Sequence, residues 1–161
     1  MGADRNTMIQ ENRQICIQFQ LLADHTMAQK ELTAVQARIL LYILSHSEEG
    51  TSLTRIQQEF GCSKAALSEL VKQLRKKGYV RSEPSQRDNR CKILLGTDKG
   101  KQVRDFLNGS FHRATEQLYS GFSPEELAIL DRLQKMQLNN LSAMRQSGND
   151  NSNHNKEVSK S

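Results

Sequence analysis

The chain has 161 residues, of which 36% are hydrophobic and 25% are charged, and its formal net charge is +5 at pH 7. This length favours one domain, and the modest apolar content fits a core that is completed in an oligomer. No run approaches the roughly 18 apolar residues of a membrane span, and the start lacks the pattern of a secretion signal. We therefore expect a cytoplasmic protein without a membrane partner.

Two amphipathic helices are predicted at the start of the chain. Residues 8–29 place apolar side chains at helical spacing, over about six turns. Thr33 followed by Gln36 is the pattern of a capping box, and it opens a second helix that ends near residue 45.

The next two helices are separated by a very short break. Ser52 opens a helix over residues 53–60, and the break at residues 61–62 leaves Ser63 as the N-cap of a helix that Gly78 stops. In this fourth helix, leucines at positions 67, 70 and 74 share the core face. Two helices joined by so tight a turn form a helix-turn-helix.

Positive charge is concentrated between Lys64 and Arg104. That segment has 12 Lys or Arg residues and 4 Asp or Glu residues, a balance of +8, whereas the rest of the chain has a balance of −3. Clustered cations that bind phosphates release counterions from DNA and so provide affinity without sequence information. A charge run alone fits a solvated helix equally well.

A hairpin and two further helices are predicted after Gly78. The chain enters a strand at residues 79–80, turns over residues 84–89 and returns over residues 91–95. Thr97 then caps one helix that ends near residue 120, although Gly109 weakens its middle by about 1 kcal/mol. Ser123, Pro124 and Glu126 form a strong start for a final helix, and residues 146–161 are polar enough to predict a disordered tail.

In this order the elements and motifs resemble the MarR family of winged-helix transcription regulators. The resemblance covers roughly residues 8–144. Its motifs are Leu53-Thr54-Arg55-Ile56, the run from Ser63 to Leu74, Gly78-Tyr79-Val80, Asp88-Asn89-Arg90 and Thr97-Asp98-Lys99-Gly100. Gly96 departs from the family pattern, which has an apolar residue there, so we expect the last strand of the wing to end early or bend.

The expected fold is therefore mainly α: a winged helix-turn-helix with six helices and a β-hairpin wing. We expect an N-terminal dimerisation helix in residues 1–30, the DNA-binding domain in 31–100 and C-terminal dimerisation helices in 101–145. Apolar stripes at both ends of the chain could pack together and against a second copy. A homodimer of this kind fits a pseudo-palindromic operator in double-stranded DNA.

The resemblance also implies which side chains meet DNA. In similar proteins the amino-terminal half of the recognition helix contacts bases and phosphates, which here nominates Ser63, Lys64, Ala65, Ser68 and Lys72. Glu69 either accepts from a cytosine amino group or contacts Lys72 or Gln73 within the protein, and the second interpretation is favoured.

The family pattern assigns the wing tip as well. Asp88 should hold Arg90 for the minor groove, with Arg87 nearby for phosphates, and Arg90→Ala should lose about 1–3 kcal/mol of operator binding. The alternative is that Asp88 and Arg90 only stiffen the hairpin.

The signal that releases such a regulator has several candidates. Cys16 lies where the peroxide-sensing branch of the family has its reactive cysteine, but Gln20 replaces the expected tyrosine one turn later, so a buried structural cysteine is favoured. A small aromatic or phenolic effector could bind between the dimerisation helices and the winged domain. The residues that we expect to line its site are Phe19, His25, Tyr42 and His46.

Metal and enzyme chemistry have weaker support. A metal-responsive regulator is an alternative, since the histidines at positions 25, 46 and 112 could converge in space. They are widely separated in the sequence, however, and the three cysteines are an odd number at wide spacings, so we assign no metal ligand, no cofactor and no disulfide framework. The sequence contains no Gly-rich phosphate loop and no nucleophile with an evident base, and Gly78 and Gly100 are interpreted as helix breakers. A winged-helix protein that binds nucleic acid without sequence preference remains an alternative to the regulator.

Overall fold

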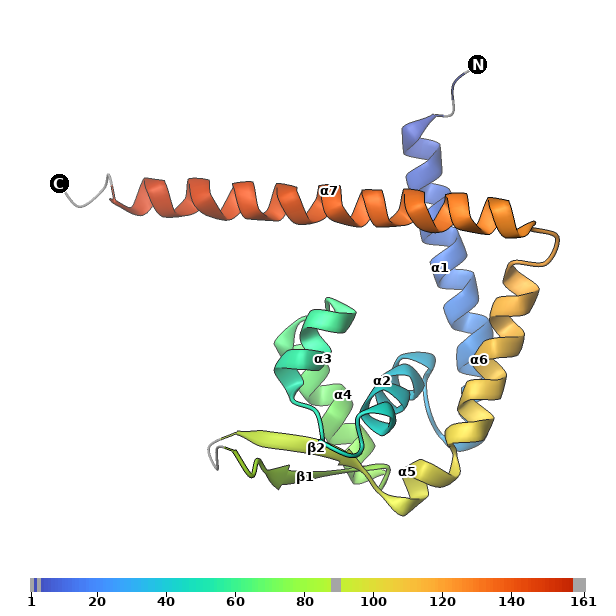
Figure 1. Ribbon diagram of the computed structural model, residues 1–161, viewed down its shortest axis with the longest axis vertical. Coiled ribbons are helices and arrows are strands. Elements are labelled where there is room, and N and C mark those ends of the chain that lie inside the picture. The colour runs from blue at the N-terminus through green and yellow to red at the C-terminus, as the bar shows by residue number, and fades with distance from the viewer. Residues whose placement is uncertain (1, 3, 88–90, 158–161) are drawn as a thin grey trace. The chain divides into compact units, whose positions relative to one another are not determined.

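The computed structural model of the chain describes residues 2, 4–87 and 91–157, with side chains described as far as residue 146. The chain divides into two compact units, residues 1–118 and residues 119–161. The described part is mainly helical with one antiparallel hairpin, which confirms the predicted fold class (Figure 1). Its elements are α1 (Arg5–Met27), η1 (Ala28–Lys30), α2 (Ala34–Ser45), α3 (Leu53–Phe60), α4 (Lys64–Lys76), β1 (Val80–Pro84), β2 (Lys92–Gly96), α5 (Asp98–Gln102), α6 (Arg104–Leu118) and α7 (Pro124–Glu157).

The predicted capping residues start the helices as expected. Thr33 and Gln36 form a complete capping box at α2, in which the Thr33 N–H donates to the Gln36 side chain over 3.1 Å and the Gln36 N–H donates back over 3.2 Å. Ser123 and Glu126 form a second box at α7, with bonds of 2.8 and 3.2 Å. These bonds satisfy N–H groups that have no partner inside the helix.

Asp4 caps α1 four residues before the predicted start at residue 8. Hydrogen bonds from the Thr7 hydroxyl and from the backbone N–H groups of Thr7 and Asn6 hold the pKa of the Asp4 carboxyl below its usual value. The carboxylate therefore stays charged at the positive end of the helix dipole.

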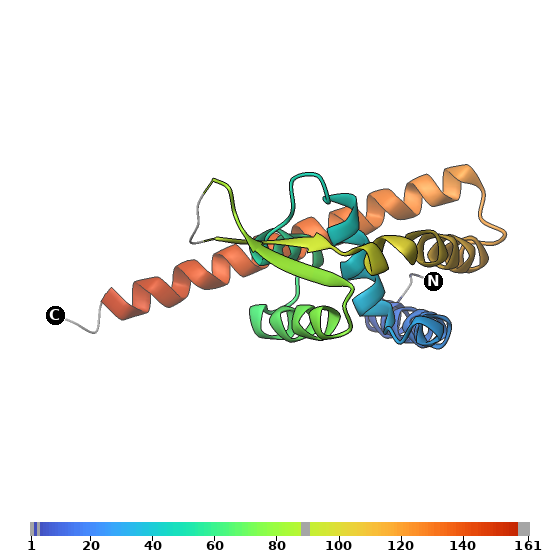
Figure 2. The same cartoon turned by 90° about the horizontal axis from the view of Figure 1, so that it is seen from below.

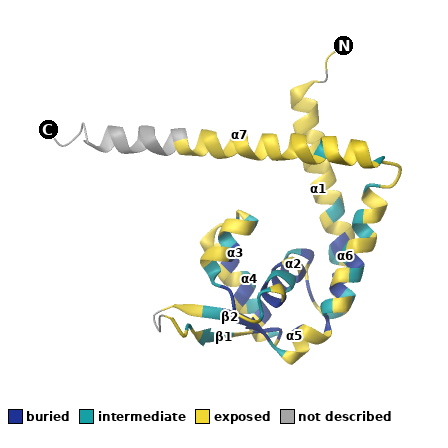
Figure 3. Ribbon diagram, viewed as in Figure 1, coloured by how far each residue is buried: buried dark blue, intermediate teal, exposed yellow. Residues whose placement is uncertain are grey.

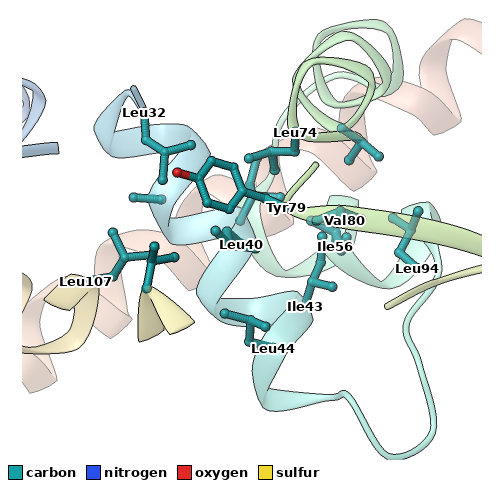
Figure 4. Packing of buried hydrophobic residues seen from close by; sticks show 14 of the residues in the cluster. Leu32, Leu40, Ile43, Leu44, Ile56, Leu74, Tyr79, Val80, Leu94 and Leu107 are labelled. Carbon is teal, nitrogen blue, oxygen red and sulfur yellow. The ribbon is translucent and has the colours of Figure 1, made fainter. Parts of the chain in front are cut away.

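The core lies in the first unit and centres on α2. Leu40, Ile43, Ile56 and Leu74 are fully buried and come from three different helices (Figure 4). On α4 the predicted core leucines 67 and 74 are buried and leucine 70 is partly buried, while Val71 is a further core residue that the leucine pattern did not include. Packing against α2 therefore fixes which face of α4 is left for solvent.

The wing is the hairpin of β1 and β2, which lie side by side next to α4 (Figure 2). Its register pairs Val80 with Gly96 and Pro84 with Lys92. Thr51, in the segment before α3, exchanges two backbone hydrogen bonds with Leu94 and so adds a short bridge to the far side of β2.

Two glycines have roles other than those predicted. The expected early end or bend at Gly96 is wrong, because Gly96 is the last paired residue of β2; a Cβ there would lie 2.3 Å from a methyl carbon of Leu44. Gly100 is not a breaker but lies inside α5, where a Cβ would approach the Tyr79 carbonyl oxygen to 2.4 Å. Gly100 needs the smallest residue because its close neighbour is backbone, whereas at Gly96 the close neighbour is the end of a leucine side chain.

Tyr79, which follows α4, ties this part of the chain to the end of η1. Its hydroxyl donates to the Lys30 carbonyl over 2.8 Å, and its ring lies under the Lys99 ammonium, 4.5 Å from the centroid. Burial, with a smaller effect of the Glu31 carboxylate, raises the pKa of Tyr79, which keeps the hydroxyl protonated as a donor.

The single helix predicted after the wing is divided at Val103 into α5 and α6. The described residues therefore contain seven α-helices rather than six. Val103 is 9% exposed, and the following Arg104 donates to the Leu44 carbonyl at the end of α2 over 3.0 Å. This tertiary packing explains the division, whereas Gly109 lies within α6 without interrupting it.

The last helix extends beyond the prediction. α7 continues to Glu157, so a helix occupies most of the segment that was predicted to be a disordered tail from residue 146. Asn, Ser and one Gly are weak helix formers but not breakers like proline, so a helix with a strong start can run through them. Among the described residues, none of the helices combines the length and apolar character that crossing a membrane requires.

Candidate nucleic-acid interface

The recognition helix α4 presents a polar and cationic face to solvent. Every residue that the sequence nominated on it is exposed: Ser63, Lys64, Ala65, Ser68 and Lys72. Because the leucines of the same helix are buried, the helix cannot rotate to hide this face without exposing its core side. The face is therefore held outward by the packing of the domain.

Ser63 has a structural role besides its nominated one. Its Oγ accepts a hydrogen bond of 3.2 Å from the Ala66 N–H, which makes it the N-cap of α4. The hydroxyl proton remains available to donate, so one side chain can both cap the helix and contact a phosphate.

Glu69 contacts its own protein, as the favoured interpretation predicted. Its Oε1 accepts from Nε2 of Gln73 over 3.2 Å, and its Oε2 lies 3.8 Å from Nζ of Lys72. Both side chains of the ion pair are more than half exposed, so the pair adds little to the stability of the fold. It sets the local charge of the recognition face instead.

A basic groove of about 540 Å³ runs between the second half of α4 and strand β1. Its charged lining consists of Lys72, Arg75, Lys76 and Arg81. The sequence nominated only Lys72, although helical spacing from Lys72 to Arg75 and Lys76 was a usable signal. Arg81 also pairs with Glu83 on the same strand, so part of its charge is offset.

The wing contributes a second charged groove of about 570 Å³, which reaches from the hairpin to the segment between α2 and α3. Arg55, Arg81 and Arg87 line it together with three glutamates, at positions 48, 49 and 83. Arg87 is exposed, as its nomination requires, and its N–H donates to Ser85 Oγ over 3.2 Å. Asp88 and Arg90 lie outside the described residues.

The four nominated effector residues are not brought together in one pocket. Phe19 lines a pocket of about 160 Å³ between α1 and α2, with Cys16, Gln20 and Arg38 among its other lining residues. Tyr42 and His46 instead stack on each other with ring centroids 4.3 Å apart, and His25 is exposed on α1. The prediction missed Arg38, which shares one helix face with Tyr42 and His46 but lies a turn closer to Phe19.

Arg38 is the charged group of this pocket. Its guanidinium lies 5.6 Å from the ring centroid of Phe19 and 5.5 Å from that of Phe111. Two aromatic faces at these distances hold the guanidinium by cation–π attraction while leaving its N–H donors available.

Cys16 lines the same pocket and is exposed, so the interpretation of a buried structural cysteine is wrong. No group of three or more His, Cys, Asp or Glu side chains suited to a metal ion occurs in the part of the chain that the structure describes.

Sequence similarity relates this chain to a known protein family. Residues 30–90 match the model of the MarR family. The chain is 33% identical over 87 residues to the HTH-type transcriptional regulator YwaE of Bacillus subtilis (strain 168), a match that spans 54% of this chain and about half, 51%, of that relative. It is 30% identical over 112 residues to YdgJ, an HTH-type transcriptional regulator of the same organism, covering 67% of this chain and 68% of YdgJ.

A solved structure shares the fold. The S. aureus MepR–DNA complex aligns with a TM-score of 0.75 at 22% sequence identity, covering 80% of this chain and 92% of that one.

Proposed function

Because the chain belongs to the MarR family of winged-helix transcriptional regulators, we propose that it binds specific sites in double-stranded DNA and represses the promoters that contain them. Members of this family regulate transcription and are not enzymes. A regulator that acts on chromosomal DNA works in the cytoplasm, which is the location that we propose.

The observation that carries the proposal is the outward face of α4. Lys64, Ser68 and Lys72 follow one another at helical spacing on that face and are all exposed. A helix fits the major groove, where hydroxyl and ammonium groups reach base edges and phosphates and where Ala65 can approach a thymine methyl group. MepR, whose fold is similar, was solved in complex with DNA.

A homodimer completes the proposal. Large apolar side chains on α1 are exposed, among them Ile9 at 68% and Leu21 at 64%, and several on α7 are exposed as well. Most of α1 and of the described part of α7 is exposed in Figure 3. A second copy of the chain is the partner that we propose for these faces, because a symmetric interface buries the same patch on both copies. The dimer would present two recognition helices to a pseudo-palindromic operator.

The wing assignment is part of this proposal. We propose that Asp88 holds Arg90 for the minor groove beside the site that α4 reads, and that Arg87 contacts the DNA backbone. Arg90→Ala is expected to lose about 1–3 kcal/mol of operator binding, whereas Arg87→Ala should weaken binding to all duplexes alike.

Selection of genomic fragments that the protein retains tests the proposal. Binding to the recovered site is measured at a fixed salt concentration against bulk DNA from the same genome. A regulator should prefer its site by about a thousandfold or more. Equal affinity for both would contradict the regulator and would favour a winged-helix protein that binds nucleic acid without sequence preference.

We propose that a small aromatic anion in the pocket between α1 and α2 releases the protein from DNA. At about 160 Å³ this pocket is near the size that holds one benzene ring, and the Arg38 guanidinium supplies the positive charge. Benzoate should weaken operator binding by the wild type and not by Arg38→Met, with phenol as the uncharged comparison. The roles of His25, Tyr42 and His46 as further effector contacts remain predictions.

A thiol switch at Cys16 is the second candidate signal, and the exposure of this cysteine in the same pocket favours it. Accessible thiols are the ones that peroxides oxidise. Loss of DNA binding after treatment with an organic hydroperoxide, retained by Cys16→Ser, would support the switch. Unchanged binding after treatment would contradict it.

A further inference from the structure

The glutamine pair Gln36 and Gln73 joins the amino end of α2 to the exposed face of α4. Gln36 is 2% exposed, and its Nε2 donates a hydrogen bond of 2.6 Å to Oε1 of Gln73. Gln73 in turn donates through Nε2 to Oε1 of Glu69, over 3.2 Å. The other carboxylate oxygen of Glu69 lies 3.8 Å from the Lys72 ammonium. This relay begins in the core and ends at a cation on the recognition face.

The direction of the relay is fixed at its buried end. Oε1 of Gln36 accepts from the Thr33 N–H and from the Lys77 ammonium, each over 3.1 Å, and neither group can act as an acceptor. The oxygen of Gln36 is therefore committed, and its NH₂ group must face Gln73. Gln73 then has to present its own oxygen to Gln36 and its NH₂ group to Glu69.

The buried end is also anchored to neighbouring elements. The Ala34 N–H, next to the capping box, donates to Oδ1 of Asp24 on α1 over 2.6 Å. Lys77 donates to the Glu31 carbonyl as well as to Gln36. Gln36 thus has little freedom to turn, and the donor that it offers to Gln73 is held in place.

Glu69, at the outer end of the relay, lies where its negative charge affects DNA binding. Its side chain is 57% exposed on the face that carries Ser68 and Lys72. A carboxylate that rotated freely there would repel DNA phosphates. The bond from Gln73, four residues later, turns the carboxylate toward the carboxyl end of α4 and away from the first two turns, where base contacts are proposed.

We propose that Gln36 and Gln73 are positioning residues for DNA binding, which hold the Glu69 carboxylate beside Lys72 and away from the DNA backbone. This inference rests on the proposed function, since it concerns how the recognition face meets a duplex. It assigns a role in binding to a buried residue that cannot itself touch DNA.

Gln36→Glu is the most informative variant, because it replaces the NH₂ donor of the Gln36–Gln73 hydrogen bond with an acceptor and hardly changes the shape of the side chain. A carboxylate at this position can still accept from Thr33 and pair with Lys77, but it cannot donate to Gln73. The Gln73 amide is then expected to turn over and present its oxygen to Glu69, which releases that carboxylate. Gln73→Leu removes the same bond from a less buried position, and Gln102→Glu adds the same charge at an exposed site on α5.

The experiment is a double-mutant cycle on duplex affinity, in the wild type and in a Glu69→Gln background. Gln36→Glu and Gln73→Leu should each weaken binding by about three- to tenfold alone, and by less than about twofold in the Glu69→Gln background. Gln102→Glu should change binding equally in both backgrounds. A loss of the same size in both backgrounds would show a merely structural role and overturn the proposal, as would no loss in either single variant.

The affinities of the double-mutant cycle are measured with the selected operator and with a duplex of random sequence, because repulsion from phosphates weakens binding to both. If the wild type binds the two duplexes equally, the proposed function fails while the cycle still decides the role of the relay. If the wild type prefers its operator and the cycle shows no coupling, the relay fails alone. Thermal unfolding and helix content confirm that each variant is folded.

Discussion

The winged domain and the helices that flank it use apolar residues in opposite ways. In the winged domain Ile56, Leu67 and Leu74 are at most 1% exposed, whereas on α7 Leu138 is 62% and Met144 is 69% exposed. The difference is visible along the chain in Figure 3, where α2 is largely buried and α1 and the described part of α7 are largely exposed. One domain completes its core within a single chain, and the flanking helices carry apolar surface that a single chain leaves in water.

The prediction with the largest expected effect tests whether the difference in burial is matched by a difference in unfolding free energy. Leu74→Ala removes a fully buried side chain and should cost about 2–5 kcal/mol of unfolding free energy. Leu138→Ala on α7 makes the same chemical change and should cost less than about 0.5 kcal/mol in a dilute, monomeric sample. Chemical denaturation measures the unfolding free energy of both variants. Equal losses would contradict a difference in stability between the two regions.

The next effect concerns the partner of the exposed faces. Leu133→Asp and Leu141→Asp each remove an apolar side chain from α7, and each should raise the dimer dissociation constant by about tenfold to a hundredfold. Asn139→Asp adds the same charge to the same helix and should leave the constant nearly unchanged. Sedimentation at micromolar concentration measures the mass, and a wild-type chain that sediments as a monomer would rule out the proposed dimer.

The sequence predicted best what depends on neighbouring residues. The capping box of Thr33 and Gln36, the N-cap at Ser63 and the buried face of α4 all follow from local spacing, and the structure has them. The winged topology came from the order of such local signals. The residues nominated for DNA contact on α4 came from the family resemblance; they are exposed, and their contacts with DNA stay a prediction.

What the sequence did not predict depends on contacts between distant segments. The break at Val103 accompanies the bond from Arg104 to Leu44, 60 residues away. In the sequence, Gly96 and Gly100 resemble ordinary turn residues. Only the fold shows that Leu44 lies against Gly96 and the Tyr79 carbonyl against Gly100. The pocket of Phe19 and Arg38 also required the packing of α1 on α2, which periodicity cannot supply.

Close packing in the winged domain gives the third prediction. Gly100→Ala places a Cβ against the Tyr79 backbone and should cost about 1–3 kcal/mol, because backbone cannot move aside as a flexible side chain does. Gly109→Ala on α6 meets only the Arg113 guanidinium at 3.4 Å and should gain about 0.5–1 kcal/mol from helix propensity. Thermal unfolding measures both, and a stabilised Gly100→Ala variant would contradict the packing at α5.

The smallest effect compares the two capping boxes, which share their chemistry but lie in different regions. Thr33→Ala should cost about 1 kcal/mol of global unfolding free energy, because its box starts the helix at the centre of the core. Ser123→Ala removes an equivalent cap from an exposed helix, so the loss should appear as fraying of α7 and leave the denaturation midpoint of the winged domain unchanged. Hydrogen exchange resolves the two cases by residue. If Ser123→Ala lowers protection in α2 and α4 as much as Thr33→Ala does, the two regions unfold as one cooperative unit, and the contrast in burial between them has no counterpart in stability.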